Sequence, residues 1–299
     1  MSGNQVPFIL PEIGDGPVLI AGPTASGKSA LAIEIVSRFG GQIINGDAIQ
    51  VFDEWRVLTA RPSVADEFEF PHKLYGHVSL DQTYSVGHWL RDVEPLLNSG
   101  LRPIIVGGTG LYFTALTQGL AQIPPIPSDI RQAADDLRLT QGHAAMLPDL
   151  DTNTISRIDT QNPMRVQRAW EVWRATGKQI ATWQDETPAP LLALNSTTPI
   201  VMDAPKDWLN DRIARRFDLM LETGALDEAR SILPHWDPSL LSSKAIGAPE
   251  LIAYLQGTLS LAEAKERSTI ATRQYAKRQR TWFRSRMSDW QGFDPSTHQ

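Results

Sequence analysis

The stretch PVLIAGPTASGKS, residues 17–29, decides the fold. Its first five residues form a compact apolar run, which is typical of a buried strand. Residues 22–29 fit the pattern G-x-x-x-x-G-K-[ST], and the apolar residues after Gly27 are spaced as in an amphipathic helix. Strand, glycine-rich turn and helix in this order predict a phosphate-binding loop, in which backbone N–H groups and the helix N-terminus hold phosphate oxygens. Lys28 would contact a terminal phosphate, and Ser29 could hold Mg²⁺.

Three further apolar runs extend this pattern. Residues 42–46 end at Asp47, residues 102–106 precede the glycine-rich segment 107–110, and residues 200–202 end at Asp203. Helices are expected at 28–39, 86–97, 208–222 and 262–287. Strands that alternate with helices predict an α/β fold, a P-loop NTPase-like parallel sheet flanked by helices.

The composition changes twice between the runs at 102–106 and 200–202. Residues 123–128 read IPPIPS, and residues 187–199 are rich in Pro, Ser and Thr, with only helical periodicity between them. The sequence therefore predicts an irregular N-terminal arm at 1–16, an α/β core made of 17–122 and 191–299, and an all-helical insertion at 123–190.

Composition excludes several classes of protein. The chain has 299 residues, 41% of them hydrophobic, and a net charge of −6, so it can bury a core and is not a globally basic nucleic-acid coat protein. It has no cysteine, which excludes disulfides, thiolate metal sites and a cysteine nucleophile. No apolar run reaches about 18 residues, and the N-terminus does not resemble a signal peptide. We therefore expect a cytoplasmic monomer without membrane attachment.

Two polar residues fall where strands of the predicted sheet end. Asp47 follows the strand at 42–46 and Thr109 follows that at 102–106, and ligands of parallel sheets bind at these carboxyl ends. Asp47 could act as a general base near the phosphate, or as a helix cap. Thr109 could bond a substrate, or complete a turn. P-loop NTPases usually carry an acid after such a strand to support Mg²⁺, and its absence after Val106 argues against an ordinary ATPase.

The C-terminal segment 265–286 concentrates positive charge. It holds eight Lys and Arg residues against one acid, and a stripe of four recurs at helical spacing: Arg273, Lys277, Arg280 and Arg284. The stripe is expected to contact a diphosphate or an RNA backbone, unless it is only a solvated helix face. Ala271, Tyr275 and Trp282 are expected to face the core.

The predicted insertion places Arg165 and Arg168 beside Trp170 and Trp173. Arginines next to aromatic rings could grip unstacked bases. Two tryptophans three residues apart are, however, more typical of a bundle core, and both interpretations stay open at this point.

Together these motifs resemble the tRNA dimethylallyltransferase (isopentenyl-tRNA transferase) family. The resemblance extends from about Val18 to Trp282. The segments that carry it are GPTASGKS (22–29), D-x-x-Q (47–50), TARP (59–62), PHKL (71–74), YSVGHW (84–89), VGGTGLYF (106–113), DRIARRFDLMLETGALDEA (211–229), KAIGAPEL (244–251) and ATRQYAKRQRTW (271–282).

The resemblance implies an activity and roles for individual residues. The family transfers a dimethylallyl group from dimethylallyl diphosphate to the exocyclic N6 amine of adenine 37, beside the tRNA anticodon, and its P-loop binds diphosphate rather than ATP. Asp47 would be the general base, Thr109 a second catalytic residue, and Ser29 the ligand of Mg²⁺. Diphosphate would be held by Gly22, Thr24, Ala25, Ser26, Gly27, Lys28, Ser29, Arg273 and Lys277. The anticodon stem-loop would contact Asp47, Ala48, Ile49, Gln50, Thr109, Arg131, Met164, Arg165, Val166, Gln167, Arg168 and Lys244.

The chain departs from the family pattern at a few positions. Ala48 and Ile49 stand where the family usually has Ser-Arg, Phe52 where it has Tyr, and Ala248-Pro249 where it has an aromatic and a cation. Three other functions fit part of this pattern: a small-molecule kinase with a P-loop, a dimethylallyltransferase acting on free AMP, ADP or ATP, and a non-catalytic RNA-binding module. The long insertion with its arginines favours tRNA over a free nucleotide.

Overall fold

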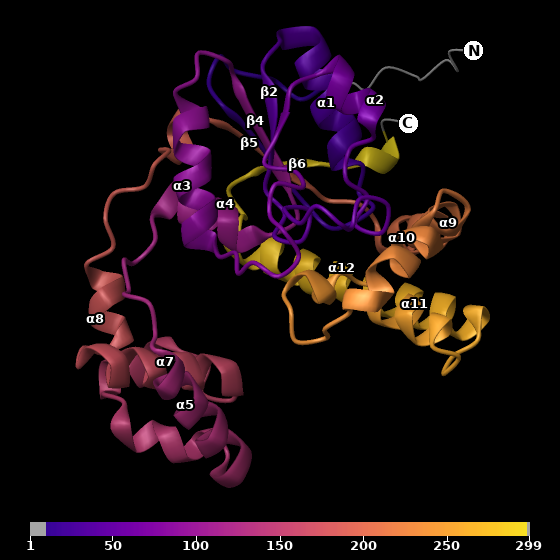
Figure 1. Ribbon diagram of the computed structural model, residues 1–299. Coiled ribbons are helices and arrows are strands. Elements are labelled where there is room, and N and C mark those ends of the chain that lie inside the picture. The colour runs from indigo at the N-terminus through magenta and orange to yellow at the C-terminus, as the bar shows by residue number, and fades with distance from the viewer. Residues whose placement is uncertain (1–9, 298–299) are drawn as a thin grey trace, which may run out of the picture. The chain divides into compact units, whose positions relative to one another are not determined.

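A parallel six-stranded sheet forms the centre of the α/β core in the computed structural model, which describes residues 10–297. The strand order is β3-β2-β4-β1-β5-β6, and every pair of neighbours is parallel. Figure 1 shows helices on both faces of this sheet. The strands are β1 (Val18–Ala21), β2 (Gln42–Asn45), β3 (His72–Lys73), β4 (Pro103–Gly107), β5 (Thr198–Met202) and β6 (Gln291–Phe293).

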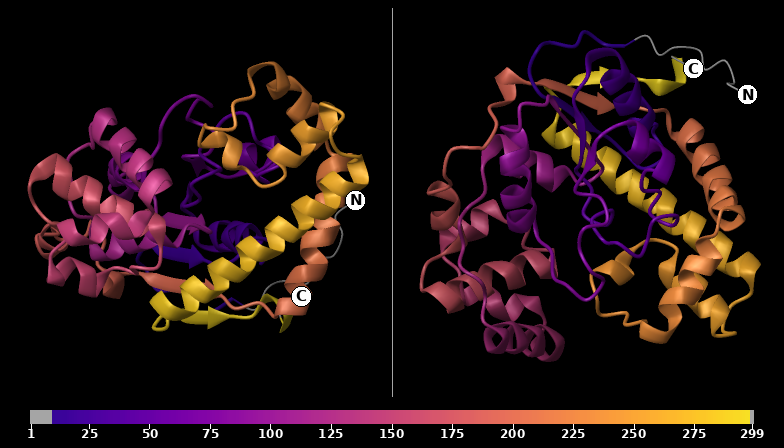
Figure 2. Two further views of the ribbon diagram at one scale, coloured as in Figure 1. Left: turned by 90° about the horizontal axis from the view of Figure 1, so that it is seen from below. Right: turned by 45° about the horizontal axis from the view of Figure 1, so that its top comes forward.

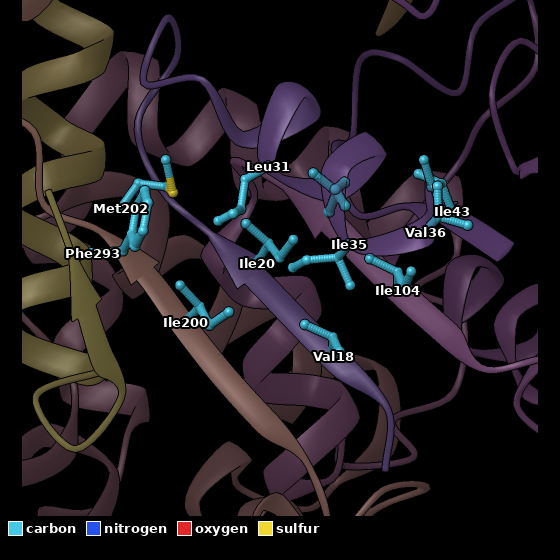
Figure 3. Packing of buried hydrophobic residues seen from close by; sticks show 12 residues of the cluster. Val18, Ile20, Leu31, Ile35, Val36, Ile43, Ile104, Ile200, Met202 and Phe293 are labelled. Carbon is cyan, nitrogen blue, oxygen red and sulfur yellow. The ribbon is translucent and has the colours of Figure 1, made fainter. Parts of the chain in front are cut away.

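Helix α1 (Lys28–Phe39) covers one face of the sheet. Alternate residues of β1 point to opposite faces, so Val18 and Ile20 meet α1 while Leu19 and Ala21 face the other layer. Figure 3 shows how the apolar side of α1 packs onto the strands. Burial on both faces explains why β1 is apolar without interruption.

Three helices cover the opposite face: α3 (Val86–Leu97), α4 (Gly110–Gln118) and α12 (Leu261–Arg286). Trp89 of α3, Phe113 of α4 and Phe283 of α12 belong to the same buried cluster. Figure 2 shows α12 as one long helix that runs from this layer to α9 and α11. It therefore connects the sheet to the helices that follow β5.

A smaller helical layer packs against the loop after β2. It consists of α9 (Lys206–Glu222), α10 (Ala225–Ile232) and α11 (Ala248–Leu255), and it shares a buried cluster with Trp55 and Leu58. The remaining short elements of the core are α2 (Val64–Glu69) and the 3₁₀ helices η2 (Leu194–Ser196), η3 (Leu233–His235), η4 (Ser242–Lys244) and η5 (Pro295–Thr297).

The chain divides into two compact units, one made of residues 1–117 and 192–299 and the other of residues 118–191. The second unit is all-helical and begins at Gln118, where the sequence suggested Ile123. Its own core includes Met146, Val166 and Trp170. Its elements are α5 (Ser128–Gln141), η1 (His143–Asp149), α6 (Thr152–Arg157), α7 (Pro163–Thr176) and α8 (Ile180–Asp185).

The long predicted elements are confirmed, while the small ones were missed. The helix expected at 86–97 is α3, and the one expected at 262–287 is α12, shifted by one residue at each end. Strands β3 and β6 and helices α2, α10 and α11 were not expected, because elements this short carry little periodic signal. The N-terminal arm was predicted at 1–16, and its first nine residues lie outside the described part of the chain. No helix in residues 10–297 is long and apolar enough to cross a membrane.

The buried face of α12 was predicted only in part. Trp282 packs against the core cluster as expected, whereas Ala271 and Tyr275 are only partly buried. The buried residues of the helix are Ala264, Ser268, Thr269, Ala276, Gln279 and Phe283. Three of these six side chains are polar, so the hydrophobic pattern did not identify this face.

Candidate active site

The phosphate loop lies between β1 and α1, as predicted. Ala25 and Gly27 have positive φ angles of 63° and 88°, which turn the chain tightly ahead of α1. Lys28 Nζ donates to the carbonyl of Pro23 at 2.6 Å. The Ser26 hydroxyl is buried and has no hydrogen-bond partner within residues 10–297. A buried, unpaired hydroxyl in such a loop is expected to bond a ligand.

A cavity of about 890 Å³ opens at the carboxyl ends of β1, β2 and β4. The loop residues Thr24, Ala25, Ser26, Gly27, Lys28 and Ser29 line it, together with Asp47. The opposite wall comes from α9 and α12, which contribute Arg212, Arg215, Arg216 and Arg278. Most charged residues of the lining are thus cationic, and Asp47, just after β2, is one of two carboxylates among them.

The arginines of α9 are site residues that sequence reasoning missed. Arg212 also donates from Nε to the carbonyl of Ala25, at 3.0 Å, and so supports the phosphate loop. A signal was present, because positions 212, 215 and 216 fall on one face of a helix that follows a strand. What α9 packs against could not be read from that spacing.

Burial and neighbouring charges shift the pKa values of two cationic side chains in the cavity. Burial lowers the pKa of Lys28 to about 7; Asp47 acts against this shift and Arg216 adds to it. Burial also lowers the pKa of Arg216 to about 10, again opposed by Asp47. An anion in the cavity would relieve this cost, because it stabilises the charged form of both groups.

Asp47 is held through its backbone. Its N–H donates to Asn45 Oδ1 at 2.8 Å, and Asn45 Nδ2 donates to the Asp47 carbonyl at 2.9 Å. The Asp47 carboxylate accepts from the Ile49 N–H at 3.0 Å through Oδ1. Trp89 in turn donates to the Asn45 carbonyl at 2.7 Å. Packing of α3 on the sheet therefore fixes where the carboxylate enters the cavity.

Thr109 lies next to Asp47, as its place after β4 suggested. Its Oγ1 accepts from the N–H of Ala48 at 2.9 Å, and its own N–H donates to the Gly46 carbonyl at 3.3 Å. The hydroxyl proton is not used in that bond, so it remains able to donate to a substrate. Thr109 is partly exposed and is not among the residues that line the cavity.

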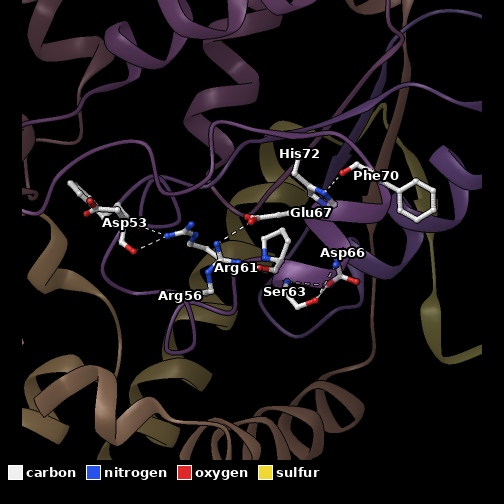
Figure 4. Close-up of polar contacts among 10 residues, drawn as sticks. Asp53, Arg56, Arg61, Ser63, Asp66, Glu67, Phe70 and His72 are labelled. Atoms are coloured by element: carbon white, nitrogen blue, oxygen red, sulfur yellow. Dashed lines mark hydrogen bonds and ion pairs between the residues drawn. The ribbon is translucent and has the colours of Figure 1, made fainter. Parts of the chain in front are cut away.

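A loop after β2 lines another side of the cavity. Figure 4 shows polar contacts within this loop and with α2. Arg61 donates to the carbonyls of Phe52 and Asp53, at 3.0 and 2.9 Å. Arg56 pairs with Glu67 of α2 at 3.0 Å. Arg61 thus holds the TARP segment (59–62) against residues 52–53, and the Arg56–Glu67 pair holds α2 against the same loop.

Gln50 lines the cavity, and its side-chain amide is hydrogen-bonded within the same loop. Its Nε2 donates to the carbonyls of Thr59 and Ala60, at 2.8 and 3.1 Å. Ile49 also lines the cavity, Ala48 packs into the core, and Lys244 lines the cavity while donating to the Pro238 carbonyl. With Asp47 and Thr109, these four residues are the ones in the α/β core that the sequence predicts to contact tRNA.

Three expected phosphate-site residues lie elsewhere. Arg273 and Lys277 are exposed on α12 and line no part of the cavity that residues 10–297 form, whereas Arg278 does. Gly22 is buried at the end of β1, where an added Cβ would lie 2.6 Å from Cβ of Met202. Gly22 therefore allows close packing of β5. Asp203, which follows β5, pairs with Arg284 at 3.7 Å and does not line the cavity.

Within the helical unit, the expected tRNA-contact residues divide into two groups. Arg131, Arg165 and Arg168 are exposed, and Met164 is 60% exposed. Val166 is fully buried, and Gln167, only 3% exposed, accepts from Arg138 Nε at 2.6 Å. Burial is incompatible with the direct tRNA contact expected of these two residues.

The tryptophans of α7 agree with the bundle-core interpretation. Trp170 is buried and donates to Asp149 Oδ2 at 2.8 Å, and Trp173 is partly buried. Arg174 lies over both rings, 5.3 and 5.4 Å from their centroids.

The donor set of the cavity suits a hard cation that brings most of its own ligands. Ser29, at the start of α1, and Asp47 offer oxygen atoms. Residues 10–297 contain no cluster of three or more His, Asp or Glu side chains able to hold a metal. Mg²⁺ fits such a site when substrate phosphates and water complete its coordination.

The fold and the cavity define an α/β protein with a P-loop-like turn beside a cavity that several arginines line. A family model for IPP transferases matches residues 50–286, and the chain belongs to this family. Proteins named tRNA dimethylallyltransferase from Cereibacter sphaeroides and Dinoroseobacter shibae are each 61% identical to it, over 94% and 95% of this chain and 97% and 96% of their own. The solved structure of a full-length tRNA isopentenylpyrophosphate transferase from Bacillus halodurans aligns with a TM-score of 0.67 and 31% identity, covering 94% of this chain and 90% of that one.

Proposed function

We infer that the protein is a prenyltransferase that moves the dimethylallyl group of dimethylallyl diphosphate to the N6 amine of adenine 37 in tRNA and releases diphosphate. The observation that carries this function is the meeting of Lys28 and Asp47 in one cavity, in a chain 61% identical to tRNA dimethylallyltransferases. A phosphate loop and a carboxylate base are the two groups that the reaction needs. We also propose a cytoplasmic location, because the proposed substrate is tRNA.

Asp47 is proposed as the general base. The adenine amine is a poor nucleophile, because its lone pair is delocalised into the ring. As the bond from N6 to the allylic carbon forms, the amine loses a proton, and the Asp47 carboxylate accepts it. The bond between that carbon and the diphosphate oxygen breaks, and the diphosphate leaves with the electron pair. Thr109, beside Asp47, is proposed to donate its free hydroxyl proton to the reacting adenosine or the diphosphate.

The cationic wall is proposed to stabilise the leaving diphosphate. Negative charge grows on its oxygens as the allylic carbon departs, and Lys28, Arg216 and Arg278 lie in the same cavity. Preorganised charges in a site sheltered from water are a major source of catalysis. Ser29 would hold Mg²⁺ together with the diphosphate oxygens, and the ion would add further charge neutralisation there.

The helical unit is proposed to bind the anticodon stem-loop through exposed Arg131, Arg165 and Arg168. Adenine 37 must leave the loop stack to reach Asp47, as in other enzymes that act on a single base. Unpaired loop bases are easier to extrude than paired ones, which suits an anticodon-loop target.

The test is to incubate the protein with labelled dimethylallyl diphosphate, Mg²⁺ and total tRNA, and to identify the labelled nucleoside. Label on N6-dimethylallyl adenosine at position 37 is expected. Parallel reactions contain AMP, ADP or ATP as the acceptor, and ATP consumption is followed with tRNA absent. Label on free nucleotides but not on tRNA would indicate a free-nucleotide prenyltransferase. Consumption of ATP without prenyl transfer would indicate a kinase.

A further inference from the structure

Helix α12 carries one buried amide that reaches two loops of the cavity at once. Gln279 is only 5% exposed, although Lys277 and Arg278 beside it are exposed. Its Oε1 accepts from the Thr24 N–H of the phosphate loop at 2.8 Å. Its Nε2 donates to the Gly108 carbonyl, in the turn after β4, at 2.9 Å. Both ends of the side chain are therefore bonded to backbone.

We propose that Gln279 is a positioning residue, which ties the phosphate loop to the Gly108–Thr109 turn and so sets the distance between the diphosphate and Asp47. Only a side chain with one acceptor and one donor at this length can make both bonds. An ionised glutamate would accept from Thr24 but would repel the Gly108 carbonyl. The proposal rests on the proposed function and adds the residue that keeps the diphosphate site and Asp47 at a fixed distance.

The space around the turn supports this role. A Cβ on Gly108 would overlap the Gln279 amide and lie 3.2 Å from Asp47 Oδ2. A Cβ on Gly110 would overlap the ring of Trp282, one turn further along α12. Helix α12 therefore contacts the turn on both sides of Thr109, by a hydrogen bond at Gly108 and by packing at Gly110.

The series of hydrogen bonds continues from the Gly108–Thr109 turn to the segment that holds Asp47, the proposed base. Thr109 Oγ1 accepts from the N–H of Ala48, the residue after Asp47. In the sheet, β4 lies between β1 and β2. Gln279 thus joins the ends of β1 and β4, and Thr109 joins the ends of β4 and β2. Because the Thr24 N–H already bonds Gln279, this part of the loop is fixed before a substrate arrives. A misplacement of about 1 Å between reacting groups can cost about a hundredfold in rate.

The experiment compares Gln279→Glu, Gln279→Met and the native protein in single-turnover prenylation of tRNA across a range of pH. Both variants are expected to lower the rate at saturating substrates by roughly 10- to 100-fold, with a smaller change in KM for dimethylallyl diphosphate. Gln279→Glu should also move the acid limb of the pH–rate profile to higher pH, because it adds a negative charge near Asp47. Gln279→Met adds no charge and should leave that limb in place.

The matched control is Gln274→Glu, which makes the same change at an exposed position of α12. It is expected to behave as the native protein. Melting temperatures of all variants show whether each is folded, and Gln279→Met, which keeps side-chain length, carries the test if the glutamate variant unfolds. Native rates in both Gln279 variants, or a defect confined to KM, would overturn the proposal. Failure of the native protein to prenylate tRNA would instead overturn the proposed function.

Discussion

Asp47 and Lys28 illustrate how single residues acquire their roles from their surroundings. The Asp47 backbone is held by Asn45, and its carboxylate enters a cavity with several arginines. Lys28 is part-buried and bonds a carbonyl of its own loop. Neither residue type is unusual in itself, so burial and neighbours decide what each can do.

We expect Asp47→Asn to slow the chemical step by roughly 10²- to 10⁴-fold, the usual contribution of a general base. Asparagine is nearly isosteric but a far weaker base. Single-turnover rates at saturating tRNA measure this step, and the affinities for diphosphate and tRNA should change much less. Asp81→Asn, at an exposed carboxylate, is the control. A normal rate for Asp47→Asn would refute the base role, and a defect only in affinity would make Asp47 a residue that positions the adenine.

Replacement of Lys28 by alanine is expected to abolish turnover. The change removes the mobile positive charge of the phosphate loop, and with it diphosphate affinity and leaving-group stabilisation. Titration with inorganic diphosphate and a prenylation assay check the two effects separately. Near-normal turnover together with normal diphosphate affinity would contradict the assignment of the loop.

The affinity for diphosphate is expected to fall as the pH rises above about 7. Burial lowers the pKa of Lys28 to about 7 in the ligand-free protein, and a bound anion stabilises the ammonium and raises that pKa. Below pH 7 Lys28 is already charged, whereas above it binding must take up a proton, so affinity drops by up to about tenfold per pH unit. Calorimetry in buffers of different ionisation enthalpy measures the proton uptake. Lys28→Arg, which stays charged, should lack it, and equal uptake in both proteins would contradict the prediction.

At the scale of elements, α9 supplies arginine side chains to the cavity, and the phosphate loop contains none. Its arginines line the cavity from the side opposite the loop. Arg212 also donates to the loop carbonyl of Ala25, and Arg216 helps to lower the pKa of Lys28. The cationic helix singled out from the sequence, α12, contributes Arg278 and Gln279 rather than its exposed stripe.

Arg216→Gln is expected to weaken diphosphate binding by roughly 10- to 100-fold, the range for a lost hydrogen bond to a charged group. It should also move the alkaline loss of affinity to higher pH, because Arg216 helps to lower the pKa of Lys28. Titrations at several pH values test both effects. Arg230→Gln, at a surface ion pair on α10, is the control and should change neither. An unchanged affinity for Arg216→Gln would exclude this arginine from the diphosphate site.

At the scale of the whole molecule, the proposed chemistry is confined to one unit, whereas the proposed tRNA contacts are spread over both. The cavity belongs entirely to residues 1–117 and 192–299, and the helical unit has a separate core. Changes on the surface of the helical unit should therefore affect tRNA without affecting diphosphate.

Neutralising Arg165 and Arg168 together, by substitution with glutamine, is expected to weaken tRNA binding. The slope of log affinity against log salt should become shallower by about 1 for each lost phosphate contact. Binding of dimethylallyl diphosphate should stay intact. The control changes net charge equally, with Arg38→Gln and Arg230→Gln at surface ion pairs of the other unit. An unchanged tRNA affinity and an unchanged salt slope would show that α7 has only a structural role.

The sequence by itself determined four of the six strands (β1, β2, β4 and β5), the loop between β1 and α1, and the position of Asp47 just after β2. These features depend on local order: apolar runs buried on both faces, a glycine-rich turn and a helix that starts at once after it. Long helices such as α3 and α12 were predicted to within a residue for the same reason. The short elements β3, β6, α2, α10 and α11 were missed, because they hold too few residues to establish a period.

Only the tertiary structure decided which side chains face the cavity. The stripe of Arg273 and Lys277 has regular helical spacing, yet it faces away, while Gln279 on the same helix is buried between two loops. Val166, expected at a tRNA surface, is buried in the helical unit. The physical reason is that spacing defines a face of a helix but not what packs against that face, and a buried polar side chain such as Gln279 is tolerated only where distant segments supply both hydrogen-bond partners.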